Sequence, residues 1–280
     1  MTDSTAPPTN STDSAAEFVT PTSAAALAAT LDYHAAPDVG DPLPHLWHWI
    51  FFRPVVRQSQ IATDGHPVKG GFLPDLGLPR RMWAGGRLRF HSPLTVGSPI
   101  TRDSTIANVS EKEGQRGKLA FVTVKHEIRS GGALAIDEEQ DVVYREPASS
   151  VVANPSPTAA PSDELWHRDI MPTEVLLFRY SALAFIGHRI HYDKPYTTEV
   201  EGYPDLVVHG PLIGTLLMDL LRRNQPQSMV LDFSFKAVRP SFLRKAPHLC
   251  GRPSPDGKTV ELWSRDHEGW LTMSASATLA

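Results

Sequence analysis

One stretch near the C-terminus, Pro211–Arg223, constrains the fold more than any other part of the chain. Its bulky residues form neighbouring apolar pairs that recur every four residues, which predicts a helix with one broad apolar stripe. The pairs are Leu212 and Ile213, Leu216 and Leu217, and Leu220 and Leu221. Pro211 suits the first turn, where its missing N–H is harmless, and Asn224 and Pro226 end the helix. About 13 residues at 1.5 Å each make it roughly 20 Å long. Because this helix is almost entirely apolar, we expect other elements of the fold to cover it.

The residues after this helix alternate between apolar and polar side chains, as strands with one buried face do. The alternation runs through Leu231–Ala237 and again through Leu271–Leu279. Between them, Val260–Trp270 predicts a hairpin that turns at Asp266–Gly269. Upstream, Pro172–Leu183 has the apolar spacing of another helix. A buried helix followed by several antiparallel strands predicts an α+β layer.

The first half of the chain carries weaker traces of the same pattern. Strands are expected at Arg87–His91, Leu119–Ile128 and Asp137–Arg145, with a turn at Glu111–Gly117. These features precede their counterparts by about 145 residues, which indicates an internal repeat. Where the second half has its apolar helix, the first has Ile61–Leu78, which is rich in Gly and Pro. The central helix of the first half is therefore expected to be degenerate.

Composition divides the chain into segments. Residues 1–22 are mostly Ser, Thr, Ala and Pro and are expected to form a disordered tail. A similar stretch at residues 147–163 predicts a surface linker. This linker separates an N-terminal domain at residues 23–146 from a C-terminal domain at residues 164–280.

The bulk properties exclude several classes of function. A formal net charge of −4 gives no general attraction to nucleic acid. Cys250 is the only cysteine, so an intramolecular disulfide and a thiolate metal cluster are both excluded. No apolar run approaches the roughly 20 residues of a membrane span, and no secretory or transit signal precedes Arg53. A cytoplasmic protein with no nucleic-acid or membrane partner is expected. No GxGxxG or Walker sequence occurs, so no cofactor is expected.

Three of the twelve histidines, His188, His191 and His209, lie close together in the second half. They fall in the segments YSALAFIGHRIHYD (Tyr180–Asp193) and LVVHGPLIG (Leu206–Gly214). These segments resemble the signature of the MaoC-like enoyl-thioester hydratases and dehydratases. In that family a loop presents the pattern D-x-N-P-x-H, and a later V-H-G opens the central helix of a hot-dog fold.

The resemblance extends over residues 40–280. In the first half, DGHP (Asp64–Pro67) and RRMWAGG (Arg80–Gly86) are similar to a subgroup with two hot-dog domains on one chain. That subgroup includes mitochondrial-type 3-hydroxyacyl-thioester dehydratases and bacterial mesaconyl-CoA or itaconyl-CoA hydratases. The resemblance implies an α+β, double hot-dog fold whose antiparallel sheets each wrap a central helix. It also implies a hydro-lyase acting on an enoyl or 3-hydroxyacyl thioester, most specifically the hydration of mesaconyl-CoA or itaconyl-CoA to a citramalyl-CoA.

Two alternative functions stay open at this point. One is the dehydration of a longer, fatty-acid-type 3-hydroxyacyl thioester. The other is a non-catalytic subunit that binds acyl thioesters, since a fold does not dictate a function. An acyl-CoA is the expected small-molecule partner, and a homodimer is implied by family analogy alone.

The resemblance can be carried over position by position. The loop positions of the motif fall on Ile186, His188, Arg189 and His191, and V-H-G falls on Val208, His209 and Gly210. His191 thus matches the motif histidine. Ile186 stands where the aspartate is expected, and an isoleucine side chain cannot accept a proton or polarise water. The Asp–His dyad of the family is therefore incomplete in this chain.

Water addition to a C=C bond conjugated to a thioester needs a group that takes and returns a proton, and an imidazole suits that task. It also needs a donor for the negative charge that develops on the thioester oxygen. We expect His191 to be the general acid/base and His188 its helper. The amide of Gly210, at the start of the central helix, is expected to stabilise the charge. The residues expected to contact the substrate are Tyr180, Ile186, Arg189 and His209.

Simpler interpretations compete with some of these roles. His188 is about equally well explained as a histidine of a surface loop. Asp193 suits a helix cap, and His209 could hold the helix start by its side chain. Asp64 and His66 could lend the missing carboxylate from the other half, although DGHP is also ordinary turn sequence.

Two further possibilities were weighed from residue type. The pairs Arg80-Arg81 and Arg222-Arg223 could bind the phosphates of CoA, although a solvated charged face is the better explanation for either pair alone. His188 and His191 have the spacing of metal ligands. No third ligand follows at the expected spacing, so no metal site is expected.

Overall fold

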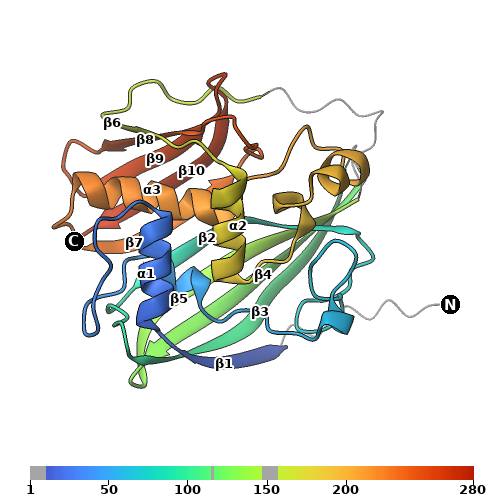
Figure 1. Cartoon of the computed structure of the whole chain (residues 1–280), viewed down its shortest axis with the longest axis horizontal. Coiled ribbons are helices and arrows are strands. Elements are labelled where there is room, and N and C mark those ends of the chain that lie inside the picture. The colour runs from blue at the N-terminus through green and yellow to red at the C-terminus, as the bar shows by residue number, and fades with distance from the viewer. Residues whose placement is uncertain (1–10, 115–116, 147–156) are drawn as a thin grey trace.

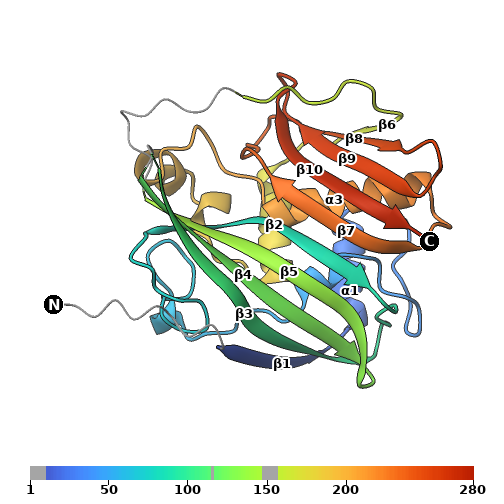
Figure 2. The same ribbon diagram turned by 180° about the vertical axis from the view of Figure 1, so that it is seen from behind.

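The structure is a computed structural model that describes residues 11–114, 117–146 and 157–280. Within these residues the strands form one antiparallel sheet of ten, in the order β1-β3-β4-β5-β2-β7-β10-β9-β8-β6 (Figure 2). The helices lie on one face of this sheet (Figure 1). None of the helices in the described ranges is both long and apolar enough to cross a bilayer. The α+β class predicted from the sequence is confirmed.

Each half of the chain contributes five strands in the same spatial order. The first half holds β1 (Thr12–Phe18), β2 (Arg80–Phe90), β3 (Pro99–Gly114), β4 (Gly117–Ser130) and β5 (Ala133–Arg145). The second half holds β6 (Trp166–Asp169), β7 (Val230–Ala237), β8 (His248–Pro253), β9 (Thr259–Arg265) and β10 (Leu271–Leu279). The halves join where β2 pairs with β7, from Gly85 opposite Lys236 to Arg89 opposite Asp232. The two expected sheets are therefore continuous with each other.

Three α-helices pack on the sheet: α1 (Pro21–Thr30), α2 (Glu174–Ala184) and α3 (Gly210–Asn224). Short turns of other helix types lie at Trp47–Ile50, Gln58–Gln60, Arg189–His191 and Tyr196–Val200. The apolar stretch predicted as a helix is α3, and ten consecutive residues of it, Leu212–Leu221, are buried. It packs against β6, β8, β9 and β10, so the strands of the second half wrap it as expected.

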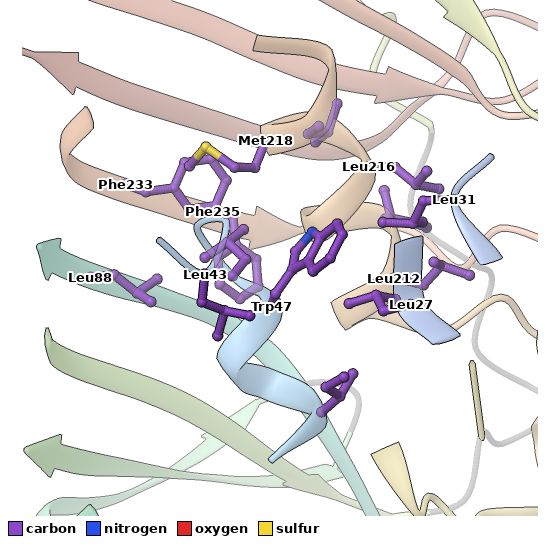
Figure 3. Close-up of a cluster of buried hydrophobic side chains, with 14 of the residues drawn as sticks. Leu27, Leu31, Leu43, Trp47, Leu88, Leu212, Leu216, Met218, Phe233 and Phe235 are labelled. Carbon is purple, nitrogen blue, oxygen red and sulfur yellow. The ribbon is translucent and has the colours of Figure 1, made fainter. Parts of the chain in front are cut away.

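The first half has no counterpart of α3 in the part of the chain that the structure describes. Ile61–Leu78 holds no helix, in agreement with its Gly and Pro content. Instead, the segment around Leu43 and Trp47 packs beside Phe235 and Met218 of the second half (Figure 3). One apolar cluster therefore extends through both halves.

Asp219 is the only charged residue inside the buried stretch of α3, and it is 2% exposed. Its carboxylate pairs with Arg168 at 2.5 Å, Arg222 at 3.3 Å and Arg223 at 2.8 Å. Arg222 and Arg223 also lie over the ring of Tyr33, 4.6 and 4.2 Å from its centroid. Both arginines are thus engaged within the protein. The two interpretations offered from the sequence, binding of CoA phosphates and a solvated charged face, therefore do not fit Arg222 and Arg223.

The tail prediction was wrong for residues 11–22. Thr12–Phe18 form β1, which pairs with β3, and α1 begins at Pro21. Most residues of β1 are exposed because it is an edge strand of the sheet. Its stability therefore comes from backbone pairing, which the sequence pattern does not show. Residues 1–10 lie outside the described residues.

Two other boundaries differ from expectation. The turn expected at Glu111–Gly117 is shorter, since β3 extends to Gly114 and β4 begins at Gly117. Most of the predicted linker at 147–163 lies outside the described residues. Its last part includes Ala159, which forms a β-bridge with Trp270.

Replacing Leu217 by Ala tests how far the fold depends on α3. Leu217 is 0% exposed, and Leu→Ala substitutions in cores cost about 2–5 kcal/mol. We expect the free energy of unfolding, measured by urea denaturation, to fall by about 3 kcal/mol. The control Met229→Ala changes a residue that is 65% exposed and should alter it by less than about 0.5 kcal/mol. Equal effects of the two substitutions would contradict the central role of α3.

Candidate active site

The histidine loop, residues 185–193, begins where α2 ends. Phe185 closes α2 in a left-handed conformation with φ 54°, which turns the chain away from the helix axis. His188 then begins a single 3-10 turn, Arg189–His191. This turn directs His191 inward, so that only 8% of the residue is exposed. The loop predicted from the motif is thus formed by the end of one helix and one tight turn.

His191 is held by the chain that leads into α3. Its Nδ1 lies 2.7 Å from the carbonyl oxygen of Val207. Because a carbonyl only accepts, Nδ1 carries the proton in this contact, which leaves a lone pair on Nε2 of the neutral ring. The ring stacks on that of His209, with centroids 3.7 Å apart and planes 19° from parallel. His191 therefore presents a basic nitrogen in a fixed orientation.

His209 is fully buried directly before α3. Its Nε2 lies 2.8 Å from Oγ of Ser181, and the ring of Tyr180 packs edge-on against it, with centroids 5.1 Å apart. The His209 side chain makes no capping hydrogen bond to α3; it holds the start of the helix through its contact with Ser181 instead. It connects α2 to α3 behind His191. Ser181 was not predicted, although a serine on the buried face of a helix is a signal for such a contact.

Burial keeps these imidazoles uncharged at neutral pH. Desolvation lowers the pKa of His191 to about 3, and the neighbouring His188 contributes to the same shift. Desolvation also lowers the pKa of His188 to about 3, with a further contribution from His66. The pKa of His209 lies well below its usual range because that ring is fully desolvated. Nε2 of His191 is consequently free to accept a proton.

A loop from the first half of the chain reaches His188. The ring of His66 lies 4.0 Å from that of His188, and Nδ1 of His66 lies 3.1 Å from Oδ2 of Asp64. Burial would raise the pKa of Asp64, but its hydrogen bonds to His66 outweigh burial and hold that pKa below its usual value. The rings of His188 and His191 are 5.5 Å apart and nearly perpendicular. The fold thus brings an ionised carboxylate near the loop whose own aspartate position is Ile186.

The two loops approach each other so closely that only glycine fits. A Cβ on Gly65 would lie 1.8 Å from the carbonyl oxygen of Gly187, and a Cβ on Gly187 would lie 2.7 Å from that of Gly65. Gly65 also has φ +90°, which disfavours other residues. The N–H of Arg189 donates to the carbonyl of Asp64 at 2.9 Å. The DGHP sequence therefore docks the first half onto the histidine loop, beyond forming a turn.

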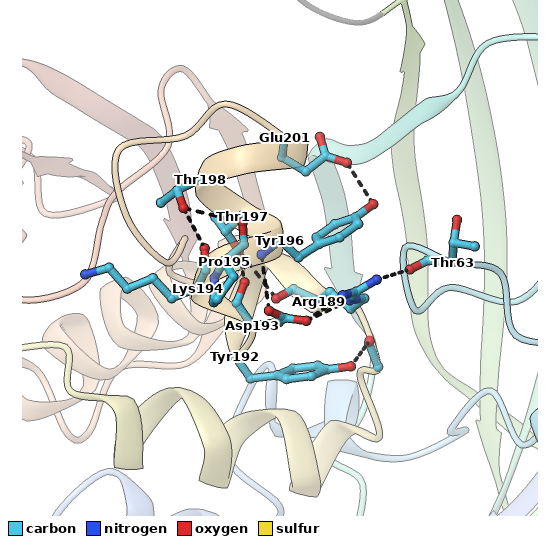
Figure 4. Close-up of polar contacts among 11 residues, drawn as sticks. Thr63, Arg189, Tyr192, Asp193, Lys194, Pro195, Tyr196, Thr197, Thr198 and Glu201 are labelled. Atoms are coloured by element: carbon cyan, nitrogen blue, oxygen red, sulfur yellow. Dashed lines mark hydrogen bonds and ion pairs between the residues drawn. The ribbon is translucent and has the colours of Figure 1, made fainter.

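The guanidinium of Arg189 is engaged within the protein (Figure 4). Its Nη2 lies 2.7 Å from Oδ2 of Asp193, and its Nη1 donates to the carbonyl of Thr63 at 3.0 Å. It also stacks on Tyr196, 3.9 Å from the ring centroid. These contacts give Arg189 a structural role, and its predicted contact with substrate stays a prediction. Asp193 accepts from the N–H of Tyr196 at 3.2 Å, so the expected capping role of Asp193 is confirmed.

The Arg80-Arg81 pair is also partly engaged. Nε of Arg80 lies 2.9 Å from Oε2 of Glu201, and Arg81 donates to the carbonyl of Pro67 at 3.4 Å. Arg80 is therefore not available for the phosphates of CoA. A role of Arg81 in binding them stays a prediction.

Gly210 is the first residue of α3. Its amide belongs to the first turn, whose N–H groups have no acceptor within the helix. A Cβ placed on Gly210 would meet no atom within 4 Å, so the space around it is open. The helix dipole adds partial positive charge at this end. The amide is therefore suited to stabilise an anion in that space.

A cavity of about 200 Å³ lies between the two halves. On the side of the second half it is lined by Tyr180, Ile186 and Pro211. The other polar residues of the lining are His48, Arg53, Arg102, His126, Glu138 and Gln140. Arg53 is engaged by Glu17, Ser23 and the carbonyl of Leu183. Tyr180 and Ile186 thus line a cavity, and their contact with substrate stays a prediction. The polar wall was missed, although its members on β3, β4 and β5 occupy inward positions of alternating strands, which the sequence pattern could have revealed.

One cluster near the histidine loop could hold a metal ion. Asp64, His66 and His188 each offer a ligand atom, and these atoms lie within 4.8 Å of one another. The sequence offered no third ligand at local spacing, whereas the fold supplies two from the other half. The expected absence of a metal stays a prediction.

Comparison with known proteins assigns the chain to a family. The sequence model of hydroxyacyl-thioester dehydratase type 2 matches residues 46–243. The chain belongs to this family. Mesaconyl-C(4)-CoA hydratase of Chloroflexus aurantiacus is 46% identical over 257 residues, which cover 91% of this chain and 91% of that relative.

Solved structures agree with this assignment at the level of the fold. A MaoC-like dehydratase superposes with a TM-score of 0.71 at 14% identity, covering 96% of this chain and 97% of the other. A Mycobacterium tuberculosis protein described as a double hot-dog superposes with a TM-score of 0.57 at 13% identity, covering 97% and 96%. The predicted double hot-dog fold is therefore confirmed.

Gly65→Ala tests the contact between the loops. The added methyl group must displace the Gly187 carbonyl, so we expect the free energy of unfolding to fall by about 2 kcal/mol or more. Gly77→Ala is a matched control, because Gly77 also has positive φ (+68°) but no atom within 4 Å of a Cβ. It reports backbone strain without the clash. Equal losses for the two variants in urea denaturation would show that the close approach is unimportant.

The buried histidines predict acid sensitivity. In the unfolded chain a histidine protonates near pH 6.5, whereas the pKa of His188 and His191 in the folded protein is about 3. Between these values the unfolded state binds more protons, so stability is complete above about pH 6.5 and falls as the pH decreases. Each such histidine contributes about 1.4 kcal/mol per pH unit in this window.

Urea denaturation at pH 7 and pH 5 measures this effect. We expect wild-type protein to be clearly less stable at pH 5, and His191→Asn to show a smaller difference. Replacing His167, whose side chain is 46% exposed, by Ala should leave the difference unchanged. A wild-type stability that is equal at the two pH values would contradict the neutral, buried state of these rings.

Proposed function

We propose that this protein adds water to mesaconyl-C4-CoA, or to the related itaconyl-CoA, and forms citramalyl-CoA. The observation that carries the proposal is the buried, neutral imidazole of His191, oriented by Val207 with its Nε2 lone pair free. The family assignment supports thioester chemistry. The identity of 46% to mesaconyl-C(4)-CoA hydratase supports this choice of substrate.

In the proposed reaction, Nε2 of His191 removes a proton from water while the water oxygen bonds to the β-carbon. In mesaconyl-C4-CoA the C=C bond is conjugated to the thioester, so its electron pair moves toward the α-carbon and the thioester oxygen. The imidazolium then returns its proton to the α-carbon, so one water is added and the histidine is restored. The ring of His191 starts the cycle neutral, and its protonated form is a strong proton donor.

The amide of Gly210 is the proposed donor to the developing charge on the thioester oxygen. A Cβ on Gly210 would meet no atom within 4 Å, and the place of this amide at the start of α3 adds the field of the helix dipole. A fixed donor of this kind contributes about 2.7–4 kcal/mol to the stability of a transition state. The close stacking of His191 on His209, the residue before Gly210, brings base and donor to the same place.

The missing aspartate is replaced in this proposal by groups from the first half. Ile186 cannot orient water, but His188 lies beside His191 and contacts His66. Asp64 binds His66, and this contact favours one orientation of the His66 ring. His188, supported by this pair, would orient the attacking water.

A short acyl group fits the observed space. The cavity of about 200 Å³ is small for a fatty-acid-type chain, which disfavours dehydration of long 3-hydroxyacyl thioesters. The proposal includes an acyl-CoA as the small-molecule partner, a cytoplasmic location and a homodimer as the working assembly.

Replacing His191 by Ala is expected to lower kcat for mesaconyl-C4-CoA by about 100- to 10,000-fold, the range typical of a lost general acid/base. The decrease in C=C absorbance measures the rate, and thermal unfolding checks the fold. His167→Ala, at an exposed histidine, should retain wild-type activity. Turnover by folded His191→Ala near the wild-type rate would overturn the assignment.

The substrate range separates the proposed function from its alternatives. Purified wild-type protein would be assayed with mesaconyl-, itaconyl- and crotonyl-CoA and with a long-chain 3-hydroxyacyl-CoA. Turnover of the long-chain substrate alone would favour the fatty-acid type of dehydratase. Binding without turnover of any of them would favour the non-catalytic subunit.

A further inference from the structure

We propose that Arg102 binds the free carboxylate of the acyl group, so that the cavity selects dicarboxylic thioesters. This inference rests on the proposed function, since it names the residue that recognises the second acid group of that substrate. It starts from a largely buried guanidinium on the cavity wall, whose Nε has no hydrogen-bond partner.

The wall that holds Arg102 is polar where an apolar surface is expected. Ser104 on β3 lies opposite His126 on β4, which lies opposite Glu138 on β5, and all three are buried. Arg102 occupies the next position of the same face of β3. In the second half the sheet packs on α3, but the first half has no such helix among its described residues. The polar row, which consists of Arg102, Ser104, His126 and Glu138, is therefore not covered by such a helix and can face the cavity.

Glu138 makes no hydrogen bond to Arg102, although its charge helps to keep the guanidinium protonated. Its Oε1 accepts from Nε1 of Trp49 at 2.8 Å and from Nε2 of Gln140 at 2.8 Å. Its Oε2 lies 3.0 Å from Nε2 of His48. Burial would raise the pKa of Glu138, but the hydrogen bond and charge of His48 outweigh burial and hold it at about 2. Glu138 is thus ionised, and both of its oxygens are occupied by other donors.

Arg102 itself is poorly compensated. Its side chain is 23% exposed, and its contact with Asp13 is long, at 3.4 Å from Nη2 to Oδ2. Asp13 is 46% exposed, so water weakens this pair. The guanidinium carbon lies 5.2 Å from the ring centroid of Phe52, and His126 brings no charge because desolvation lowers its pKa. Since arginine stays protonated, a buried guanidinium with an unpaired Nε gains from an incoming anion.

The same cavity adjoins the candidate site, although His191 and Gly210 are not among the residues that line it. Its other wall includes Ile186 of the histidine loop and Pro211, the residue after Gly210. In mesaconyl-C4-CoA the free carboxylate is attached to the β-carbon, on the side away from CoA. With the thioester at Gly210, this carboxylate extends into the cavity toward Arg102. A neutral acyl group would leave the guanidinium unpaired, which opposes binding.

Binding of two saturated thioesters tests this inference without relying on turnover, because neither can be hydrated. One is methylsuccinyl-CoA with its thioester at C4, and the other is isovaleryl-CoA, in which a methyl group replaces the carboxylate. By isothermal titration calorimetry, wild-type protein should bind the first at least about 10-fold more tightly, as expected for a hydrogen bond between charged groups. Arg102→Gln should abolish this preference by weakening the binding of methylsuccinyl-CoA alone.

Two further variants control the test. Arg89→Gln changes an arginine on β2 whose side chain is 66% exposed, and it should keep the full preference. Arg102→Lys keeps the charge but loses the planar fork, and it should keep a reduced preference. A purely structural role of Arg102 would not produce this graded change in selectivity.

The outcomes separate this inference from the proposed function. Equal binding of both thioesters by wild-type protein overturns the inference, whether or not the Arg102→Gln variant folds. Equal weakening of both ligands in that variant also overturns it. Hydration of mesaconyl-C4-CoA by wild-type protein would still uphold the proposed function. An Arg102-dependent preference without any hydration would support the inference and overturn the proposed function.

Discussion

The enclosure of α3 is the constraint on which the rest of the structure depends. Ten consecutive buried residues need apolar neighbours on every side. Strands of the second half cover one side, while α1 and the segment around Trp47 from the first half contribute to the same apolar cluster (Figure 3). Because α3 is packed on several sides, the location of its first turn is fixed. The amide of Gly210 belongs to this turn, and the ring of His209, directly before it, stacks on that of His191.

Much of the second half could be predicted from the sequence, because strong apolar periodicity defines α3, β7 and β10 locally. The first half was harder. Thr12–Phe18 consists mostly of small and polar residues, and it forms a strand only because β3 offers it a partner. Such pairing depends on residues about 90 positions away, as with Ser14 opposite Asp103. No local pattern reveals it.

In the candidate site, too, the features set by local sequence could be predicted, and those that depend on distant residues could not. Motif spacing located His188, His191 and His209, since all three are placed by adjacent segments of the second half. Motif spacing did not reveal the contact of Arg189 with Thr63, which belongs to a distant loop, and it undervalued Asp64 for the same reason. The polar row was not identified from the sequence, although the sequence contained a signal for it. A histidine or glutamate in the apolar phase of a strand departs from the binary pattern, and such departures are expected at functional positions.

The pairing of β2 with β7 has a consequence for how the two halves came to work together. If each half were a separate polypeptide, these strands would be bare edges able to associate with any compatible edge, including copies of themselves. Because the two halves are covalently connected, the pairing of β2 with β7 is intramolecular and does not depend on protein concentration. A permanent connection of this kind lets the two halves diverge, so that one retains the long helix and the other, in its described residues, does without it.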